Sequence, residues 1–174
     1  MELNRKNIDN EIEKYTRLLN EMDSYISAEN PFRLLEKIKR EKIGKGRYPE
    51  CTLFEAANRI MTDLVILYGI KELLAGKYID KGIDFDTYIV EFGNENKNDH
   101  DIMANKNGKK LIGEAFNVAT TFFNAKKYTS LKKLRTSKEN DTIKILLYNN
   151  NAVSDDYAPK TNENEYHIRV DVNI

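Results

Sequence analysis

The sequence has one cysteine, Cys51, and no tryptophan among its 174 residues. A single cysteine excludes an internal disulfide and favours a reducing compartment, so we expect a cytoplasmic protein. Two histidines accompany it, His100 and His167, which argues against a structural zinc site. The formal net charge is zero. Overall charge therefore indicates neither a nucleic-acid partner nor a membrane, and any attraction for phosphate must come from local patches.

Long hydrophobic runs are also missing. No apolar stretch approaches the length that spans a bilayer, and the polar start MELNRKNIDNEIEK is not that of a secretory signal. A composition of 40% apolar and 32% charged residues is typical of a globular protein. We expect a single domain over 1–174, with a helical N-terminal region at 1–50 and an α/β core at 51–174.

Hydrophobic periodicity predicts helices in the first half of the chain. Apolar residues recur at spacings of three and four over 7–28, and a shorter helix is predicted over about 31–43. Thr52 and Glu55 have the spacing of a capping box, which marks the start of a helix. The apolar helix that follows is expected to run to about residue 75, to stop at Gly76, and to be a core element.

From residue 85 the pattern becomes that of strands. Three segments have the β-branched and aromatic content of strands: 85–92, 142–148 and 165–172. Between them, two short runs over 101–116 flank Asn107-Gly108, a strong hairpin signal, and a helix is predicted from 117 to about 127. The predicted fold class is α/β (α+β), with a mixed β-sheet of about five strands flanked by helices.

The register of the hairpin decides which acids face each other. With Asn107 and Gly108 at the centre of a type I′ turn, counting outward places Asp101 across from Glu114, with Cβ atoms roughly 4.5 to 5.5 Å apart. A turn centred one residue earlier places Asp99 across from Glu114 instead. Opposed like charges are unfavourable unless one acid is protonated or a cation binds both. The pair therefore predicts either a magnesium site or two solvated acids at a sheet edge.

The PD-(D/E)XK nucleases share a motif: an Asp on one strand, a hairpin return, and Glu-x-Lys on the next strand, followed by a helix. Residues 50–150 resemble these nucleases in the order of their elements. Asp101 matches the motif Asp, with His100 in place of the usual Pro, and Glu114 matches the second acid. Phe116 occupies the position of the motif lysine. The resemblance implies a restriction-endonuclease-like core that hydrolyses DNA with Mg²⁺ or Mn²⁺, and it gives Asp101 and Glu114 catalytic and metal-binding roles.

In that family the lysine positions or activates water, and no neighbour is an evident substitute for it here. Lys110 is predicted on the face of Glu114, but four residues of strand span roughly 13 Å. Lys126 and Lys127 lie well into the next helix and are expected to point elsewhere. His100 precedes Asp101 and should point to the opposite face of the hairpin, as a structural or exposed residue.

Other acids could assist the pair. The resembling nucleases often add an acid from a helix before the sheet, which makes Glu55 a candidate catalytic residue. The alternative for Glu55 is the capping box itself, supported by an exposed pair with Arg59. Asp99 is a candidate metal ligand and Glu91 a similar possibility. Six acids fall between residues 84 and 101, so this side is either a metal site or a solvated rim.

Two basic segments could contact phosphates. Residues 33–47 carry seven basic residues and two acids, and 126–138 carry six basic residues and no acid. The candidate nucleic-acid-binding residues are Arg40, Lys45, Arg47, Lys126, Lys127, Lys132, Lys133 and Arg135. The alternative is a solvated, lysine-rich helix face in each case. Tyr128 could stack on a base or be a core residue.

The leading hypothesis is a metal-dependent endonuclease that acts on DNA as a homodimer, with the N-terminal helix suited to the interface. The rival is the same fold with catalysis lost, acting as a DNA-binding or protein-interaction module. A third reading is a structural interaction domain whose hairpin acids bind nothing. An enzyme needs a lysine or its equivalent within reach of the acids, whereas the interaction domain should expose the apolar face of its first helix.

Overall fold

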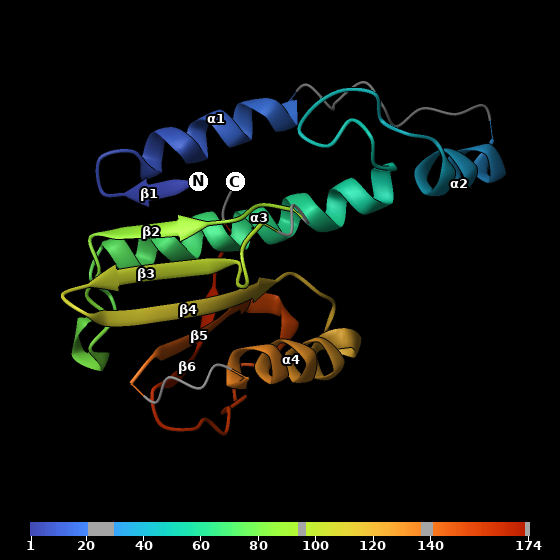
Figure 1. Cartoon of the computed structure of the whole chain (residues 1–174). Coiled ribbons are helices and arrows are strands. Elements are labelled where there is room, and N and C mark those ends of the chain that lie inside the picture. Colours follow the sequence, from blue (N-terminus) through green and yellow to red (C-terminus); the bar gives the residue numbers. More distant parts are fainter. Residues whose placement is uncertain (21–29, 94–96, 137–140, 173–174) are drawn as a thin grey trace.

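The computed structural model of the chain describes residues 1–20, 30–93, 97–136 and 141–172 (Figure 1). The strands are β1 (Glu2–Asn4), β2 (Thr87–Val90), β3 (Ile102–Lys106), β4 (Lys109–Phe116), β5 (Ile143–Asn149) and β6 (Glu165–Val170). The helices are α1 (Ile8–Asn20), α2 (Pro31–Arg40), α3 (Leu53–Leu74) and α4 (Thr120–Arg135), with short 3-10 turns η2 (Ile79–Lys81) and η3 (Asn150–Ala152). The fold is α+β, which confirms the predicted class.

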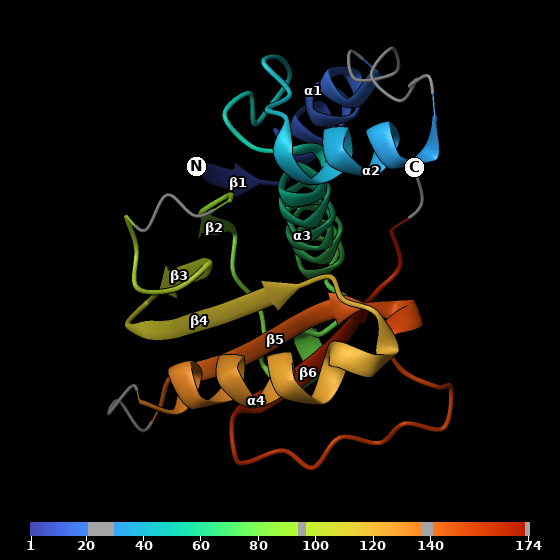
Figure 2. The ribbon, with the colours of Figure 1, turned by 90° about the vertical axis from the view of Figure 1, so that its right-hand side faces the viewer.

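All six strands form one mixed sheet in the order β1-β2-β3-β4-β5-β6. The pairs from β1 to β4 are antiparallel, whereas β4, β5 and β6 are parallel. Two helices cover the sheet, α3 on one face and α4 on the other (Figure 2). Each face has its own apolar cluster, because side chains alternate between the two faces along β4 and β5.

Helix α3 lies at the centre of the larger cluster. Its apolar stripe is buried, and Leu64, Leu67 and Ile70 have no exposed surface. Thr52 and Glu55 form the predicted capping box, in which each side chain accepts a hydrogen bond from the other residue's backbone N–H. None of the helices in the described ranges is both long enough and apolar enough to cross a membrane.

Helix α1 packs against α3 instead of presenting an apolar surface (Figure 1). Its buried residues are Ile8, Ile12 and Tyr15. The third reading required that face to be exposed, and the structure does not show it over 8–20; residues 21–28 of the predicted helix lie outside the described part of the chain. Exposed apolar side chains occur on α2 instead, where Phe32 is 70% and Leu35 60% exposed.

Two elements differ from the prediction. Strand β1 was not expected, because three residues are too few to show alternation; it pairs with β2 at the sheet edge and buries Leu3. Helix α4 begins at Thr120 and continues to Arg135, well beyond the predicted end near 127. The second basic segment is therefore mostly helical, and this decides where its lysines point.

Candidate functional site

The turn at Asn107 and Gly108 has the predicted geometry. Both residues have positive φ, 52° and 81°, as a type I′ turn requires, and Lys106 pairs with Lys109. The register continues to Ile102 opposite Gly113. One further step places Asp101 across from Glu114, so Asp101 and not Asp99 is the partner acid.

Asp101 is held in place by the backbone of the neighbouring strand. Its Oδ2 accepts a hydrogen bond of 2.9 Å from the N–H of Ala115. Burial, followed by the charge of Glu114, raises the pKa of Asp101 to about 6, although the Ala115 N–H and the charges of Lys133 and Lys126 act in the opposite direction. Burial, together with the smaller effect of the Glu114 charge, therefore favours a proton on Asp101 in mildly acidic solution.

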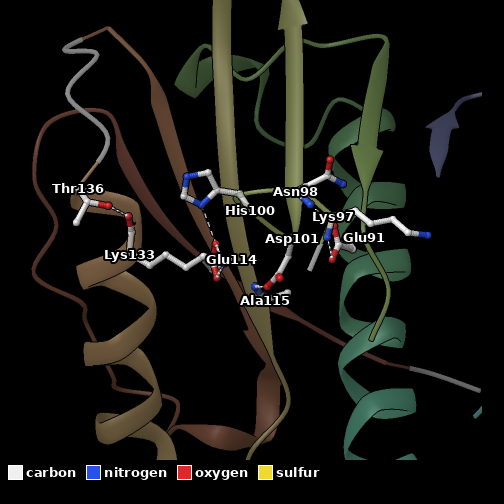
Figure 3. A network of polar contacts seen from close by, with 9 residues as sticks. All are labelled: Glu91, Lys97, Asn98, His100, Asp101, Glu114, Ala115, Lys133 and Thr136. Atoms are coloured by element: carbon white, nitrogen blue, oxygen red, sulfur yellow. Dashed lines mark hydrogen bonds and ion pairs between the residues drawn. The ribbon is translucent and has the colours of Figure 1, made fainter. Parts of the chain in front are cut away.

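Glu114 has two partners, neither of which was expected. Glu114 is only 5% exposed. The Nδ1 of His100 lies 2.8 Å from Oε1, and the Nζ of Lys133 lies 2.8 Å from Oε1 and 3.0 Å from Oε2 (Figure 3). Since a carboxylate only accepts, His100 donates from Nδ1. The expectation that His100 points to the opposite face is wrong. His100 precedes Asp101 and lies outside the regular strand, where side chains no longer alternate between the two faces.

Lys133 comes from α4, which packs beside β4, and its side chain extends from this helix toward Glu114 (Figure 3). The short connection after Phe116 carries the chain past the strand end, and α4 then returns along the sheet (Figure 2). Lys126 and Lys133 are seven residues apart and so share a helix face. Both line the same cavity as Asp101 and Glu114. The expectation that Lys126 points elsewhere is therefore wrong, because it assumed a helix that leaves the hairpin.

The cavity has a volume of about 400 Å³ and lies between α3 and α4. Acidic side chains in its lining are Asp63, Glu91, Asp101 and Glu114, and cationic ones are Arg59, Lys126 and Lys133. Arg59 was considered only as a surface partner of Glu55. Positive and negative groups thus face each other across one polar space, which suits a ligand that carries charge or is bound together with a cation.

Phe116 explains why the motif position holds no lysine. It is 1% exposed, and its ring contacts Tyr148 and Phe123 with centroids 6.0 Å and 5.9 Å apart. These rings form the apolar cluster that fixes α4 on the sheet. Phe116 therefore anchors α4, the helix that carries Lys133, and so contributes to the position of the Lys133 ammonium.

The remaining acidic candidates are Glu55 and Asp99, which lie outside the cavity, and Glu91, which lines it. Glu55 is exposed, is bound in the capping box and does not line the cavity; its pKa is lowered chiefly by the Thr52 backbone hydrogen bond. Asp99 is exposed and does not line the cavity either. Glu91 does line it, but its two carboxylate oxygens accept hydrogen bonds from the N–H groups of Lys97 and Asn98.

The candidate phosphate-binding residues divide into three groups. Arg135 makes two 2.8 Å hydrogen bonds to the buried Glu165, and Lys127 lies 3.1 Å from the hydroxyl of Tyr157, so both hold the fold together. Lys126 and Lys133 face the cavity. The others lie near or on the surface: Lys132 and Arg40 are exposed, and Lys45 and Arg47 are half-buried, with the Arg47 guanidinium over the Tyr48 ring.

One buried carboxylate at the cavity was missed altogether. Asp63 accepts hydrogen bonds from the hydroxyls of Tyr15 and Tyr48 and from the N–H of Gly93, and it has no exposed surface. Burial raises its pKa, and these hydrogen bonds oppose that shift. Gly93 has φ of 69°, and a Cβ there would lie 2.9 Å from the Tyr48 ring. The signal in the sequence was an acid inside the apolar run IMTDLVIL.

We expect Asp101→Asn to stabilise the metal-free protein near neutral pH. The pKa of Asp101 is higher in the folded than in the unfolded protein. Asp101 therefore contributes to the stability of the fold below pH 4, where it is protonated in both the folded and the unfolded state. This contribution is lost as pH rises through about 6. Asparagine removes the charge and can still accept the Ala115 N–H. The gain should be about 1 to 2 kcal/mol at pH 7.5, reduced from the full shift by partial solvent exposure.

Urea denaturation with EDTA at pH 7.5 and pH 4 measures this gain, which should nearly vanish at the lower pH. The matched control is Asp99→Asn, an exposed acid two residues away. If Asp101→Asn raised the urea denaturation midpoint, relative to the unaltered chain, by the same amount at both pH values, the raised pKa of Asp101 would be contradicted.

The chain was compared with protein-family models, with curated proteins and with solved structures. None of the three comparisons found a match.

Proposed function

We propose that the protein is a metal-dependent phosphodiester hydrolase, an endonuclease of the PD-(D/E)XK kind that acts on DNA. One observation carries the proposal: the Nζ of Lys133 lies 2.8 Å from Glu114, the acid that faces Asp101. Two hairpin acids and a lysine thus lie together, which is the set of groups that the motif combines. The lysine comes from α4 and not from β4.

Asp101 and Glu114 would hold Mg²⁺ or Mn²⁺. Magnesium is bound by one or two carboxylates together with water and substrate phosphate. In the part of the chain that the structure describes, no group of three or more His, Cys, Asp or Glu side chains is placed to hold a metal. The pair alone has the right chemistry, because a cation would offset both the burial of the Asp101 charge and the smaller repulsion from Glu114, which together raise the pKa of Asp101. When bound, the metal activates water and stabilises charge on the phosphate.

The residues of this chain would bind and orient the substrate. Lys133 is 46% exposed along its side chain, so its ammonium can leave Glu114 for a phosphate oxygen or for the attacking water. Lys126 and Arg59 face the same cavity and would hold phosphate oxygens on either side. Exposed Lys132 and Arg40 would contribute contacts to the DNA backbone, which add affinity without sequence preference.

The setting of the enzyme is part of the proposal. Cys51 is free and buried, which agrees with a reducing, cytoplasmic environment. Homodimer formation would bring two such sites to the two strands of a duplex. Since α1 is packed on α3 over its described length, the exposed Phe32 and Leu35 of α2 are the better candidates for that interface.

One observation favours a second function, DNA binding or protein interaction without cleavage. Glu114 is already satisfied by His100 and Lys133, so the fold needs no metal to stabilise this carboxylate. A protein that lost catalysis could retain this ion pair as a structural contact. The cationic face of α4 would then be the binding surface.

The experiment is cleavage of supercoiled and linear DNA by the purified chain with Mg²⁺ or Mn²⁺, beside EDTA and beside Glu114→Gln. We expect nicked and linear products only with the metal and only from the unaltered chain. Asp99→Asn, which changes an exposed acid outside the cavity, is expected to cleave normally. Retained binding with no cleavage under either metal would establish the second function and reject the first.

A further inference from the structure

Helix α4 carries an exposed aromatic side chain at the end of its cavity-facing side. Phe122 is 66% exposed, whereas its neighbour Phe123 is 3% exposed and belongs to the cluster around Phe116. At 100° per residue, Phe122, Lys126 and Lys133 fall within about 40° of one another around the helix axis. Phe122 therefore continues the row of two cations that lines the cavity.

The charge of α4 indicates what would cover this ring. The helix contains five basic residues and no acidic one. Lys126 forms no ion pair with any acid that the structure describes, and Lys133 pairs with Glu114 inside the cavity. A surface with aromatic and cationic groups in one row is typical of proteins that bind single-stranded nucleic acid, because phosphates meet the cations and every base has a face that can stack on a ring.

Resting on the function proposed above, we propose that Phe122 stacks on an unpaired base a few nucleotides along the strand from the phosphate that would be held at the Asp101–Glu114 site. Eleven residues of helix separate Phe122 from Lys133, which is about 16 Å along the axis. In an intact duplex the base faces are covered by their neighbours, so a ring on the protein surface has nothing to stack on. The substrate class that this geometry favours is DNA with a single-stranded segment beside the site of cleavage, such as an overhang, a flap or a bubble.

The chain offers a matched control in Tyr128. It is 71% exposed, similar to Phe122, and lies on the same helix. Six residues of helix rotate it by about 120° away from Phe122, and it lies with Lys132 and Arg135 on the other flank, outside the cavity with the hairpin acids. Replacing either exposed ring by leucine keeps an apolar side chain, removes stacking and leaves the core untouched.

The test is binding of fluorescently labelled single-stranded and blunt duplex oligonucleotides in EDTA, so that it does not depend on cleavage. Phe122→Leu should weaken single-strand binding fivefold or more and duplex binding less than twofold. Tyr128→Leu should change both less than twofold. A single strand with 2-aminopurine should lose fluorescence on binding the unaltered chain and not on binding Phe122→Leu. Equal effects of Phe122→Leu on both oligonucleotides, or no effect, would overturn the proposal.

The two proposals fail separately. If the protein does not cleave but its single-strand binding depends on Phe122, the stacking inference holds and the hydrolase is rejected. If the unaltered chain and Phe122→Leu both cleave blunt duplex and single strands equally well, the proposed hydrolase holds and the stacking inference is overturned.

Discussion

Replacing Lys133 by methionine is expected to slow DNA cleavage by about 10²- to 10³-fold, the usual effect of removing one group that stabilises charge in a transition state. The ammonium lies 2.8 Å from Glu114, and no other lysine contacts either hairpin acid within the described residues. Methionine keeps most of the length and the apolar stem, while His100 remains on Glu114. The loss should therefore appear in the catalytic rate, and the cost in stability from the unpaired Glu114 should be limited by the remaining His100 hydrogen bond.

Single-turnover cleavage with excess protein measures this rate directly. Lys132→Met is the control. Lys132 is exposed and is proposed to add DNA affinity and not to act in the chemical step, so at saturating protein its loss should change the rate less than threefold. Lys133→Arg tests geometry as well as charge, since guanidinium and ammonium place their donors differently. If Lys133→Met cleaved at the normal rate, the ion pair with Glu114 would be structural and the proposed role of the lysine would be wrong.

Restoring the motif lysine by Phe116→Lys should damage the fold instead of improving activity. The side chain at this position is 1% exposed between Tyr148 and Phe123. Loss of a buried aromatic ring alone costs about 3 to 5 kcal/mol, and burying an unpaired ammonium adds to this. Domains of this size are usually stable by about 5 to 15 kcal/mol, so a large part of the total would be lost.

Urea denaturation followed by circular dichroism measures that loss. Phe116→Leu keeps an apolar side chain and should cost less than half as much, which separates the effect of the charge from that of the ring. A second measurement uses the double variant Phe116→Lys, Lys133→Met: we expect no recovery of cleavage. Recovery, with a normal denaturation midpoint, would show that the strand position is still accessible to the site.

Local signals in the sequence predicted the local geometry well. Asn107-Gly108 pointed to one of the two hairpin registers considered, the one that pairs Asp101 with Glu114, and the structure has this register because both residues take positive φ. The capping box marked the start of α3 correctly. The mixed sheet and its covering helices followed from the change of hydrophobic period at residue 85.

The residues that complete the site could not be predicted in the same way. Lys133 lies 19 positions after Glu114, and its contact depends on the direction in which α4 returns, which is set by packing around Phe116. His100 lies outside the regular strand, where alternation no longer fixes the direction of a side chain. Strand β1 is held by backbone hydrogen bonds at the sheet edge, which leave little trace in side-chain pattern.

The buried carboxylate of Asp63 also bears on how such a chain can change during evolution. Tyr15 in α1 and Tyr48 in the loop before α3 both donate to it, and the N–H of Gly93 beside the cavity does so too. Loss of either phenol leaves a buried acid short of donors, so selection should act on Asp63, Tyr15 and Tyr48 as one unit. In a lineage that lost its N-terminal helix, we expect an apolar residue at position 63.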